Sequence, residues 1–594
     1  MLLAIDFETY FDSDCTLKKL NYIQYLNHPK FEVLGAAVLT DDRHEFLTHD
    51  ELVDFLDDLD PSETDVLAYN TLFDGCILAW RYGFKPRKWL DALSMARGAL
   101  ALPSHSLDAV AQHFGLPQKK AATFKGKTWS ELTFEEQREL RDYARHDVWL
   151  CHEIYNRLMP YPQDELDLID LTVRMFVEPR LELDLSLAHT LLEEQKTKKE
   201  ALRKATGLTS TQLSSNKQLA ELIKERYQLD PPTKISPTTG KETWAFSKND
   251  PEFEAFHASA PPELKSLLDA RIAIKSTIEE TRLETLIETQ EFVGKIPAQL
   301  IYHGAHTGRW SSSGGCNLLN LPKNSRIRNT LIAPPGHVLL IADSASIEAR
   351  VLAWFAEQED LIEIFHNKDD PYRQMASAIY NTPIDKITKE QRNVGKQARL
   401  GCGYSMGAPK FRTTAAKAGV ILSDEEAERI VRIYRQTNNK IKSLWYFLDD
   451  KLQPIAEGPT TNGFFVTHND YKCITFEKNA IRLPNGLTLK YPNLHTNDEG
   501  EWIYGDKRKI YAGALCENIT QALANIVIGK QALRAHREVA PVVLPVHDEI
   551  VCVTPKQGAE AKLEHLLEIM RTPPAWAPDL PLDAEGEVSA FYKK

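Results

Sequence analysis

Two aspartates about two hundred residues apart stand at the ends of apolar runs. Asp343 closes the run 337–343, and Asp548 follows the run 542–547. Each run has the length and β-branched composition of a buried strand, so we expect each aspartate at the edge of a sheet. Two carboxylates that converge at such an edge can hold two divalent cations, an arrangement that suits phosphoryl transfer.

A basic segment lies between these aspartates along the chain. Arg392, Lys396, Leu400 and Tyr404 follow one another at intervals of four residues, which places them on one drifting stripe of a predicted helix. The two cations suit the binding of a triphosphate. The alternative is an ordinary basic amphipathic helix. Three glycines within the segment disfavour that alternative, because each costs roughly 1 kcal/mol of helix stability relative to alanine and so indicates the close approach of another group.

Four further acids and a tyrosine lie in the first 160 residues. Asp6 and Glu8 are two apart on a predicted strand and therefore share one face of a sheet. Asp74 is a third acid, and Tyr143 and Asp147 share a helix face at i, i+4. Four acids supply oxygen ligands for two cations, with a polar group to orient water. Each motif alone is more typical of a strand-end turn or a helix surface.

In this order, the three motifs resemble the 3′–5′ proofreading exonucleases of the four-carboxylate class, with the tyrosine variant of the third motif. The resemblance implies an RNase H-like α/β exonuclease domain over residues 1–160. It also implies that Tyr143 positions the attacking water. The implied metal ligands are Asp6, Glu8, Asp74 and Asp147.

From about residue 170 onward the chain resembles family A DNA polymerases. The segments that carry the resemblance are 304–311, 317–323, 343–350, 392–404, 517–521 and 546–549. The resemblance implies an α+β right-hand polymerase domain over residues 161–594. Its subdomains would be a thumb at about 165–295, a palm at about 296–355 and 460–594, and fingers at about 356–459.

The same resemblance assigns roles around the nucleotide. Asp343 and Asp548 would bind two Mg²⁺ ions, for which Mn²⁺ can substitute. Glu348 would lie under the incoming sugar and exclude a 2′-hydroxyl, although it is also an ordinary acid for a helix start. The nucleotide-binding residues would be Glu348, Arg392, Lys396, Leu400 and Tyr404. Leu400 stands where the family commonly has an aromatic residue.

Four residues are expected to contact DNA. Arg309 and Lys323 lie in a Gly/Ser/Asn-rich stretch and suit phosphate contacts, which position a duplex without reading its sequence. By resemblance, Gln521 would contact the minor groove, and His547 would touch the primer end.

Composition is compatible with a large globular nucleic-acid enzyme. The 594 residues are 43% hydrophobic and 26% charged, enough for three to five domains at about 150 residues each. No apolar run approaches the ~18 residues of a membrane span, and the strand-like start leaves no room for a signal peptide. Eight scattered cysteines without a CxxC pair argue against a zinc site or disulfides. We expect a monomer in a reducing cytoplasm, that of the host if a phage encodes it.

The net charge of −13 conceals an uneven distribution. Residues 1–60 hold 14 acids and 4 bases, whereas residues 371–420 hold 9 bases and 2 acids. Residues 301–330 hold four bases and no acid. These two basic stretches flank Asp343 and predict an electropositive surface for nucleic acid.

Periodicity predicts the elements that position these residues. The first 160 residues should alternate strands and helices, and residues 356–455 should be helical. We expect one extended helix over Glu263–Glu288, a loop over Pro231–Ser247 and a hairpin at Asn485-Gly486. The individual predictions are strands at Leu2–Phe7 and Phe31–Thr40, and helices at Glu51–Leu59, Ser106–Phe114, Phe134–Leu158 and Glu517–Val539.

The sequence therefore predicts a template-directed DNA polymerase that adds dNTPs to a primer 3′ end, with a proofreading 3′–5′ exonuclease. Its motif sequences most resemble those of replicative polymerases of bacteriophages. We therefore expect replisome or processivity factors as partners, besides primer–template DNA. Two alternatives remain: an exonuclease whose C-terminal part only binds DNA, and a DNA clamp or processivity protein. The presence of both Asp343 and Asp548 disfavours both alternatives.

Overall fold

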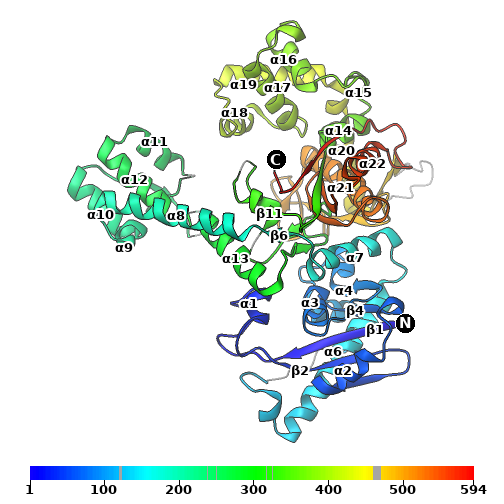
Figure 1. Cartoon of the computed structure of the whole chain (residues 1–594). Coiled ribbons are helices and arrows are strands. Elements are labelled where there is room, and N and C mark those ends of the chain that lie inside the picture. Colours follow the sequence, from blue (N-terminus) through cyan, green and yellow to red (C-terminus); the bar gives the residue numbers. More distant parts are fainter. Residues whose placement is uncertain are drawn as a thin grey trace. The chain divides into compact units, whose positions relative to one another are not determined.

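The computed structural model describes residues 1–118, 124–236, 239–248, 250–315, 317–323, 325–458 and 470–593 (Figure 1). The chain divides into two compact units. Unit 1 consists of Met1–Leu181, Pro297–Asn320 and Ala333–Ala590. Unit 2 consists of Glu182–Ile296, Leu321–Ile332 and the C-terminal end from Phe591. Within the described residues, no helix combines the length and apolarity that crossing a membrane requires.

Unit 1 begins with a mixed five-stranded sheet in the order β3-β2-β1-β4-β5. β1 runs antiparallel to β2 and parallel to β4. Leu3, Ala4 and Ile5 of β1 are fully buried because helices cover the sheet. The strands are β1 (Leu2–Thr9), β2 (Val33–Leu39), β3 (His44–Leu47), β4 (Asp65–Ala68) and β5 (Lys88–Asp91). The helices include α2 (His49–Asp57), α3 (Thr71–Arg81), α4 (Ala92–Ala99), α5 (Leu107–His113), α6 (Phe134–Leu158) and α7 (Gln163–Val177).

A second, antiparallel sheet of unit 1 has the order β20-β21-β12-β22. Its central strand β12 (His337–Ser344) pairs with both β21 (Glu549–Pro555) and β22 (Ala584–Ser589). β20 (Val542–Val546), over the run predicted to be a strand, pairs with β21. The long helix α21 (Ala512–Glu538) packs against α7 and supplies many buried apolar residues.

The segment between these sheet strands is helical, as predicted. Its helices are α14 (Ile347–Ala356), α15 (Glu359–His366), α16 (Pro371–Tyr380), α17 (Lys389–Cys402), α18 (Ala408–Lys417), α19 (Asp424–Thr437) and α20 (Asn439–Glu457). They share one apolar core with α21 and with the small strands that follow. One detail of the predicted stripe is wrong: α17 ends at Cys402, so Tyr404 lies beyond the helix.

The hairpin predicted at Asn485-Gly486 is confirmed. It joins β15 (Ala480–Arg482) to β16 (Thr488–Lys490), with the Leu483 amide donating to the Leu487 carbonyl at 2.8 Å. Gly486 has φ 87°, a left-handed conformation that glycine adopts without a steric penalty.

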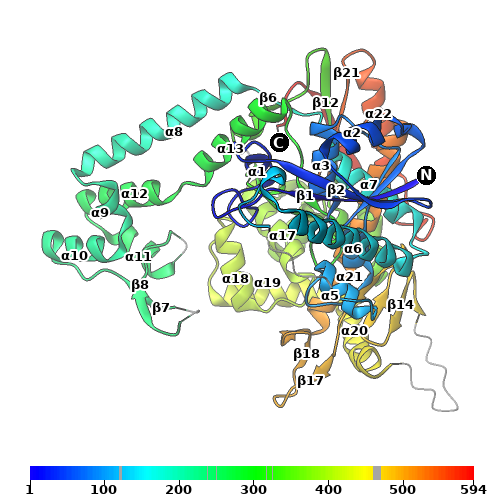
Figure 2. The same ribbon diagram turned by 90° about the horizontal axis from the view of Figure 1, so that it is seen from below.

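Unit 2 is mainly helical, with a core of buried leucine, isoleucine and phenylalanine side chains. Figure 2 shows α12 and α13 extending along the side of α8, and both helices contact it. The helices are α8 (Leu185–Thr206), α9 (Ser210–Ser214), α10 (Asn216–Tyr227), α11 (Pro251–Ser259), α12 (Pro262–Lys275) and α13 (Ile278–Val293).

Two predictions for unit 2 are wrong. The single helix over Glu263–Glu288 is broken between α12 and α13 at Ser276-Thr277, where hydroxyl side chains favour helix ends over helix interiors. The loop over Pro231–Ser247 contains a strand pair, β7 (Thr233–Ile235) with β8 (Glu242–Trp244). Periodicity missed these strands because three residues are too few to show alternation.

Candidate functional site

The two aspartates that follow apolar runs lie beside each other in unit 1. Asp343 is opposite Glu549, the first residue of β21, across the antiparallel ladder. Asp548 immediately precedes Glu549, and its carbonyl oxygen accepts a hydrogen bond from the Ser344 amide at 2.9 Å. Both aspartates are half-buried. The fold therefore brings two residues 205 positions apart to one end of one strand pair.

A two-residue turn fixes this arrangement. Val546 pairs with Glu549, which leaves only His547 and Asp548 to reverse the chain. His547 is exposed and has φ 57°, an uncommon conformation for a residue other than glycine. The strained turn places the predicted primer-end residue in solvent next to the aspartate pair.

Glu348 lies in the first turn of α14, just after β12. Its carboxylate accepts hydrogen bonds from the Arg309 guanidinium and from the Tyr404 hydroxyl, the latter at 3.3 Å. Burial and the charge of Glu348 raise the pKa of Tyr404 well above its usual value, so the hydroxyl remains a donor. Burial and Glu348 also raise the pKa of Glu517 on α21. Arg309, predicted to contact DNA, therefore neutralises the predicted sugar-contacting acid in this structure.

The cations of α17 lie over the ring of Tyr372 on α16. The Arg392 guanidinium carbon is 5.2 Å from the ring centroid, and the Lys396 ammonium nitrogen is 5.9 Å from it. Arg392 Nε also donates to Asp370 Oδ2 at 2.6 Å. Sequence reasoning missed Asp370 and Tyr372, although Asp370 followed by Pro371 is a helix-start signal that could have drawn attention to them.

The predicted close approach at the glycines is confirmed at two of three positions. A Cβ on Gly395 would lie 2.2 Å from the Tyr372 carbonyl oxygen, and one on Gly403 would lie 2.9 Å from the Leu352 side chain. A Cβ on Gly401 would meet its nearest neighbour at 3.4 Å, close to an ordinary contact. Gly395 therefore allows α17 to pack directly on the backbone of α16.

The remaining residues predicted to contact nucleotide or DNA lie on separate elements. Leu400 is 46% exposed on α17. Gln521 on α21 donates to Glu517 at 3.1 Å, which links it to the surroundings of Glu348. Lys323 is exposed and belongs to unit 2.

The five-stranded sheet carries a second group of acids. The Oδ1 atom of Asp74, in the first turn of α3, accepts a hydrogen bond from the Phe7 amide at 3.0 Å. Phe7 stands between Asp6 and Glu8 on β1, beyond the point where β1 pairs with β4. Asp74 is 3% exposed, and burial together with the charge of Asp6 raises its pKa well above the usual value. Asp6 and Asp74 are thus close enough to repel each other.

Asp147 joins these acids from α6 and is 2% exposed. The pKa of Cys151, one turn further along α6, is raised by burial and then by Asp6, Asp91, Asp74 and Asp147, so all four acids lie around it.

Glu8 and Tyr143 have fewer defined contacts. Glu8 is half-buried on β1 and contributes to the raised pKa of Tyr25, whose main cause is burial. The ring of Tyr143 lies against that of Phe124, with centroids 6.4 Å apart. Tyr143 and Asp147 lie on the same helix, as predicted.

Asp91 is a buried acid that sequence reasoning missed. It is the last residue of β5 and accepts hydrogen bonds from the amides of Asn70 and Thr71, at 2.8 Å and 3.0 Å. It thereby fixes the start of α3, the helix that carries Asp74. The signal was the same as for Asp343: an aspartate at the end of an apolar strand.

In the described part of the chain, no three His, Cys, Asp or Glu side chains form a ready-made metal site. Mg²⁺ is commonly held by one or two carboxylates, with water and substrate phosphates completing its coordination. The oxygen-only pairs Asp343–Asp548 and Asp6–Asp74 match that requirement in chemical type. The repulsion between Asp6 and Asp74 is also what a bound cation would relieve.

Comparison with known proteins agrees with the polymerase motifs. Residues 184–464 match the family model described as DNA polymerase family A. The DNA polymerase of Bacillus phage SP02 is 24% identical and aligns over 100% of this chain and 99% of its own length. DNA polymerase I of Aquifex aeolicus is 23% identical over 90% of this chain and 88% of its own length. This chain spans about a third of other bacterial DNA polymerases I that it matches.

A solved structure shares the fold. It is described as the POL domain of Pol1 from M. smegmatis in complex with DNA primer-template and dNTP. The two structures superpose with a TM-score of 0.68 at 19% identity, over 99% of this chain and 95% of that one.

Proposed function

From the match of residues 184–464 to the family model of DNA polymerase family A, we propose that this protein extends a DNA primer along a template with dNTPs. The observation that carries the proposal is the juxtaposition of Asp343 and Asp548 at one end of the β12–β21 pair. A DNA clamp has no need for two aspartates at this position. The primer–template and dNTP named for the solved structural neighbour support DNA and dNTP as substrates.

We assign different roles around the nucleotide to different residues of the chain. Arg392 and Lys396 are placed on one face of α17 to bind the triphosphate and to stabilise the charge that develops as pyrophosphate leaves. Arg392 must exchange Asp370 for phosphate, so Asp370 holds it in position beforehand. Glu348, whose carboxylate is held by Arg309 and Tyr404, would disfavour a 2′-hydroxyl on the incoming sugar.

Asp343 and Asp548 would hold two Mg²⁺ ions, which would supply Lewis-acid stabilisation for phosphoryl transfer. The half-buried position of both aspartates leaves room for phosphate oxygens and water in the coordination shell.

We further propose that the N-terminal sheet is a 3′–5′ exonuclease that removes mispaired primer ends. The cluster of the half-buried Asp6 with the buried Asp74 and Asp147, and with Glu8 beside Phe7 on β1, supports this role. Tyr143 lies on α6 with Asp147 and is suited to orient water. The end-to-end similarity to a phage DNA polymerase supports a role in replicating a phage genome.

The test is a labelled primer–template assay with Mg²⁺, run with and without dNTPs. We expect the wild type to extend the primer with dNTPs and to shorten it without them. Asp343→Asn should lose only extension, and Asp6→Ala should lose only shortening. A wild type that only degrades the primer would leave an exonuclease with a DNA-binding C-terminal part. A wild type that binds the duplex without either reaction would be a clamp.

A further inference from the structure

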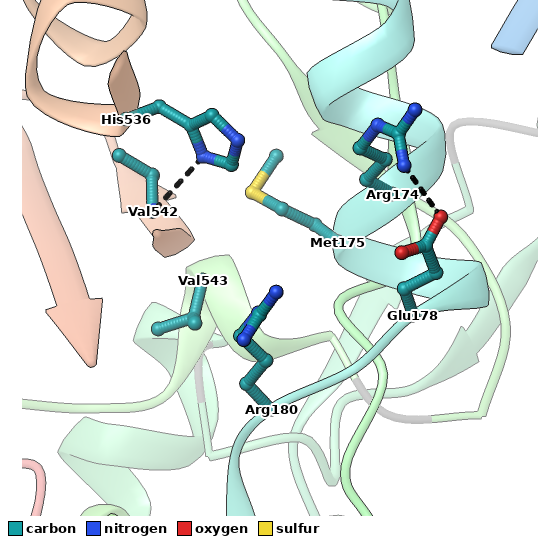
Figure 3. Close-up of a pocket in the computed structure, with 7 residues that line it drawn as sticks. All are labelled: Arg174, Met175, Glu178, Arg180, His536, Val542 and Val543. Atoms are coloured by element: carbon teal, nitrogen blue, oxygen red, sulfur yellow. Dashed lines mark hydrogen bonds and ion pairs between the residues drawn. The ribbon is translucent and has the colours of Figure 1, made fainter. Parts of the chain in front are cut away.

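A small pocket lies in unit 1 away from both groups of acids. Its volume is about 180 Å³. Its walls come from the end of α7 and the segment after it, the end of α21 and the start of β20 (Figure 3). The lining residues are Arg174, Met175, Glu178, Arg180, His536, Val542 and Val543. Val542 is the first residue of β20, and Asp548 lies in the turn beyond its last residue, Val546. The length of β20, at ~3.3 Å per residue, therefore separates the pocket from Asp548 by roughly 13 Å.

His536 offers a fixed hydrogen-bond donor to this pocket. Its Nδ1 atom accepts a hydrogen bond from the Val542 amide at 3.2 Å, so the neutral ring carries its proton on Nε2. Figure 3 shows Nε2 turned away from Val542 and into the pocket. Burial and the charges of Arg174, Arg180 and Arg537 lower the pKa of His536, which keeps the ring neutral.

Arg180 supplies the uncompensated charge. The guanidinium of Arg174 is already engaged by Asp170 and Glu178, at 3.0 Å and 2.7 Å. Arg180 forms no ion pair with any acid in the described ranges. In Figure 3 its side chain extends into the space that His536 also faces. The lining residues therefore carry two arginines and one glutamate, with one positive charge in excess.

We propose that this pocket binds a single phosphate-type oxyanion between Arg180 and the Nε2–H of His536. A guanidinium and a neutral N–H donor are complementary to tetrahedral oxyanions, and charge-assisted hydrogen bonds of this kind are strong. The volume equals that of about six water molecules at ~30 Å³ each, which suits a phosphate group with little room for a base and sugar. The apolar wall of Met175, Val542 and Val543 excludes water from the far side.

The phosphate group has two possible sources: free inorganic phosphate, or one phosphate of a DNA strand whose remainder lies outside the pocket. The recognition chemistry is the same for both. The inference stands independently of the polymerase proposal, because binding to this pocket needs neither template nor dNTP.

The experiment is calorimetric titration of inorganic phosphate into the full-length protein at constant ionic strength. We expect saturable binding with one site, weakened about tenfold by Arg180→Gln, since one charge-assisted hydrogen-bonding group is lost. Arg180→Lys keeps the positive charge but lacks the planar guanidinium, so its affinity for phosphate should lie between those of the wild type and Arg180→Gln. The matched control is Arg537→Gln, which removes the same charge nearby from a residue that pairs with Asp167 and does not line the pocket.

A competition arm identifies the source. If a short single-stranded oligonucleotide displaces phosphate from the wild type, and Arg180→Gln weakens the oligonucleotide as well, the pocket holds a strand phosphate. If phosphate binds equally with and without the oligonucleotide, the ligand is the free anion. Absence of saturable phosphate binding, or an equal loss in Arg537→Gln and Arg180→Gln with unchanged thermal melts, overturns the proposal.

Discussion

The two groups of acids in unit 1 are built in opposite ways. Around the five-stranded sheet, Asp74 and Asp147 are almost completely buried, and the backbone of β1 itself holds Asp74. In the antiparallel sheet, Asp343 and Asp548 are half-buried and placed by strand register and a two-residue turn. The first group is part of a buried core. The second group, Asp343 and Asp548, lies at the edge of its sheet and is called the rim site below.

The difference teaches what each site depends on. The hydrogen bonds of a buried acid stabilise the fold and its desolvation opposes folding, so changing it alters stability as well as chemistry. An acid at the rim can be changed with little effect on folding. The cations of α17, Arg392 and Lys396, also depend on packing, because Gly395 lies against the backbone of α16.

The largest expected effect is on catalysis at the rim site. Asp548→Asn should reduce primer extension on the order of a thousandfold, because several kcal/mol of charge stabilisation are lost at ~1.4 kcal/mol per tenfold. The melting temperature should change little, because the side chain is half-buried and the turn hydrogen bond uses the Asp548 backbone carbonyl. Primer extension and thermal melts of the same preparation check both expectations. Full activity in Asp548→Asn would rule out its proposed role.

Much of this site follows from the sequence, for a physical reason. The acids of the rim follow strongly apolar strands, and such strands are recognisable without tertiary information. Phe134–Leu158 was likewise predicted to the residue, because the Thr133/Glu136 capping box and a long periodic face mark it.

What the sequence could not provide are the partners chosen by tertiary packing. Nothing local indicates that Arg309 binds Glu348 across 39 residues, or that Asp370 and Tyr372 engage Arg392. The break at Ser276-Thr277 was missed because the apolar spacing continues on both sides of it.

The second prediction tests whether packing between α16 and α17 holds Arg392 and Lys396 in position. Gly395→Ala should destabilise the protein by about 1–3 kcal/mol, because the added methyl group would lie 2.2 Å from the Tyr372 carbonyl oxygen and force α16 and α17 apart. Gly401→Ala, on the same helix, is the control, since its nearest neighbour would be at 3.4 Å. Urea unfolding measures both. Equal stability of the two variants would show that the helices adjust freely.

The third prediction sharpens the comparison at the buried site. Asp74→Ala should cost about 1–3 kcal/mol of stability, because the buried Phe7 amide loses its acceptor. Asp74→Asn keeps an acceptor and removes the repulsion from Asp6, so it should be at least as stable as the wild type. Both variants should lose primer shortening. If Asp74→Ala and Asp74→Asn unfold at the same urea concentration, the Phe7 hydrogen bond does not contribute measurably.

The last expected effect is a difference in pH dependence between the two regions. Burial lowers the pKa of His303 to about 3 and that of His306 to about 4, so around these two histidines the unfolded state binds more protons than the folded state below pH ~6.5. The contribution of the two histidines to the free energy of unfolding is complete above pH ~6.5. It is lost as the pH falls toward 4 and then 3, with a slope of up to ~1.4 kcal/mol per pH unit for each histidine.

The pH dependence of the stability that Asp74 contributes has the opposite sign. Its raised pKa means that the folded state keeps a proton that the unfolded state releases above pH ~3.8, so its contribution falls as the pH rises from that value toward the raised pKa. Acidification from pH 7 to pH 5 should therefore weaken hydrogen-exchange protection in the wild type. The loss of protection should be larger around residues 303–309 than along β1. Replacing His306 with glutamine should reduce that loss, and Asp74→Asn should leave it unchanged. Uniform loss of protection in both regions would show that the two acid sites do not differ in how burial couples protonation to folding.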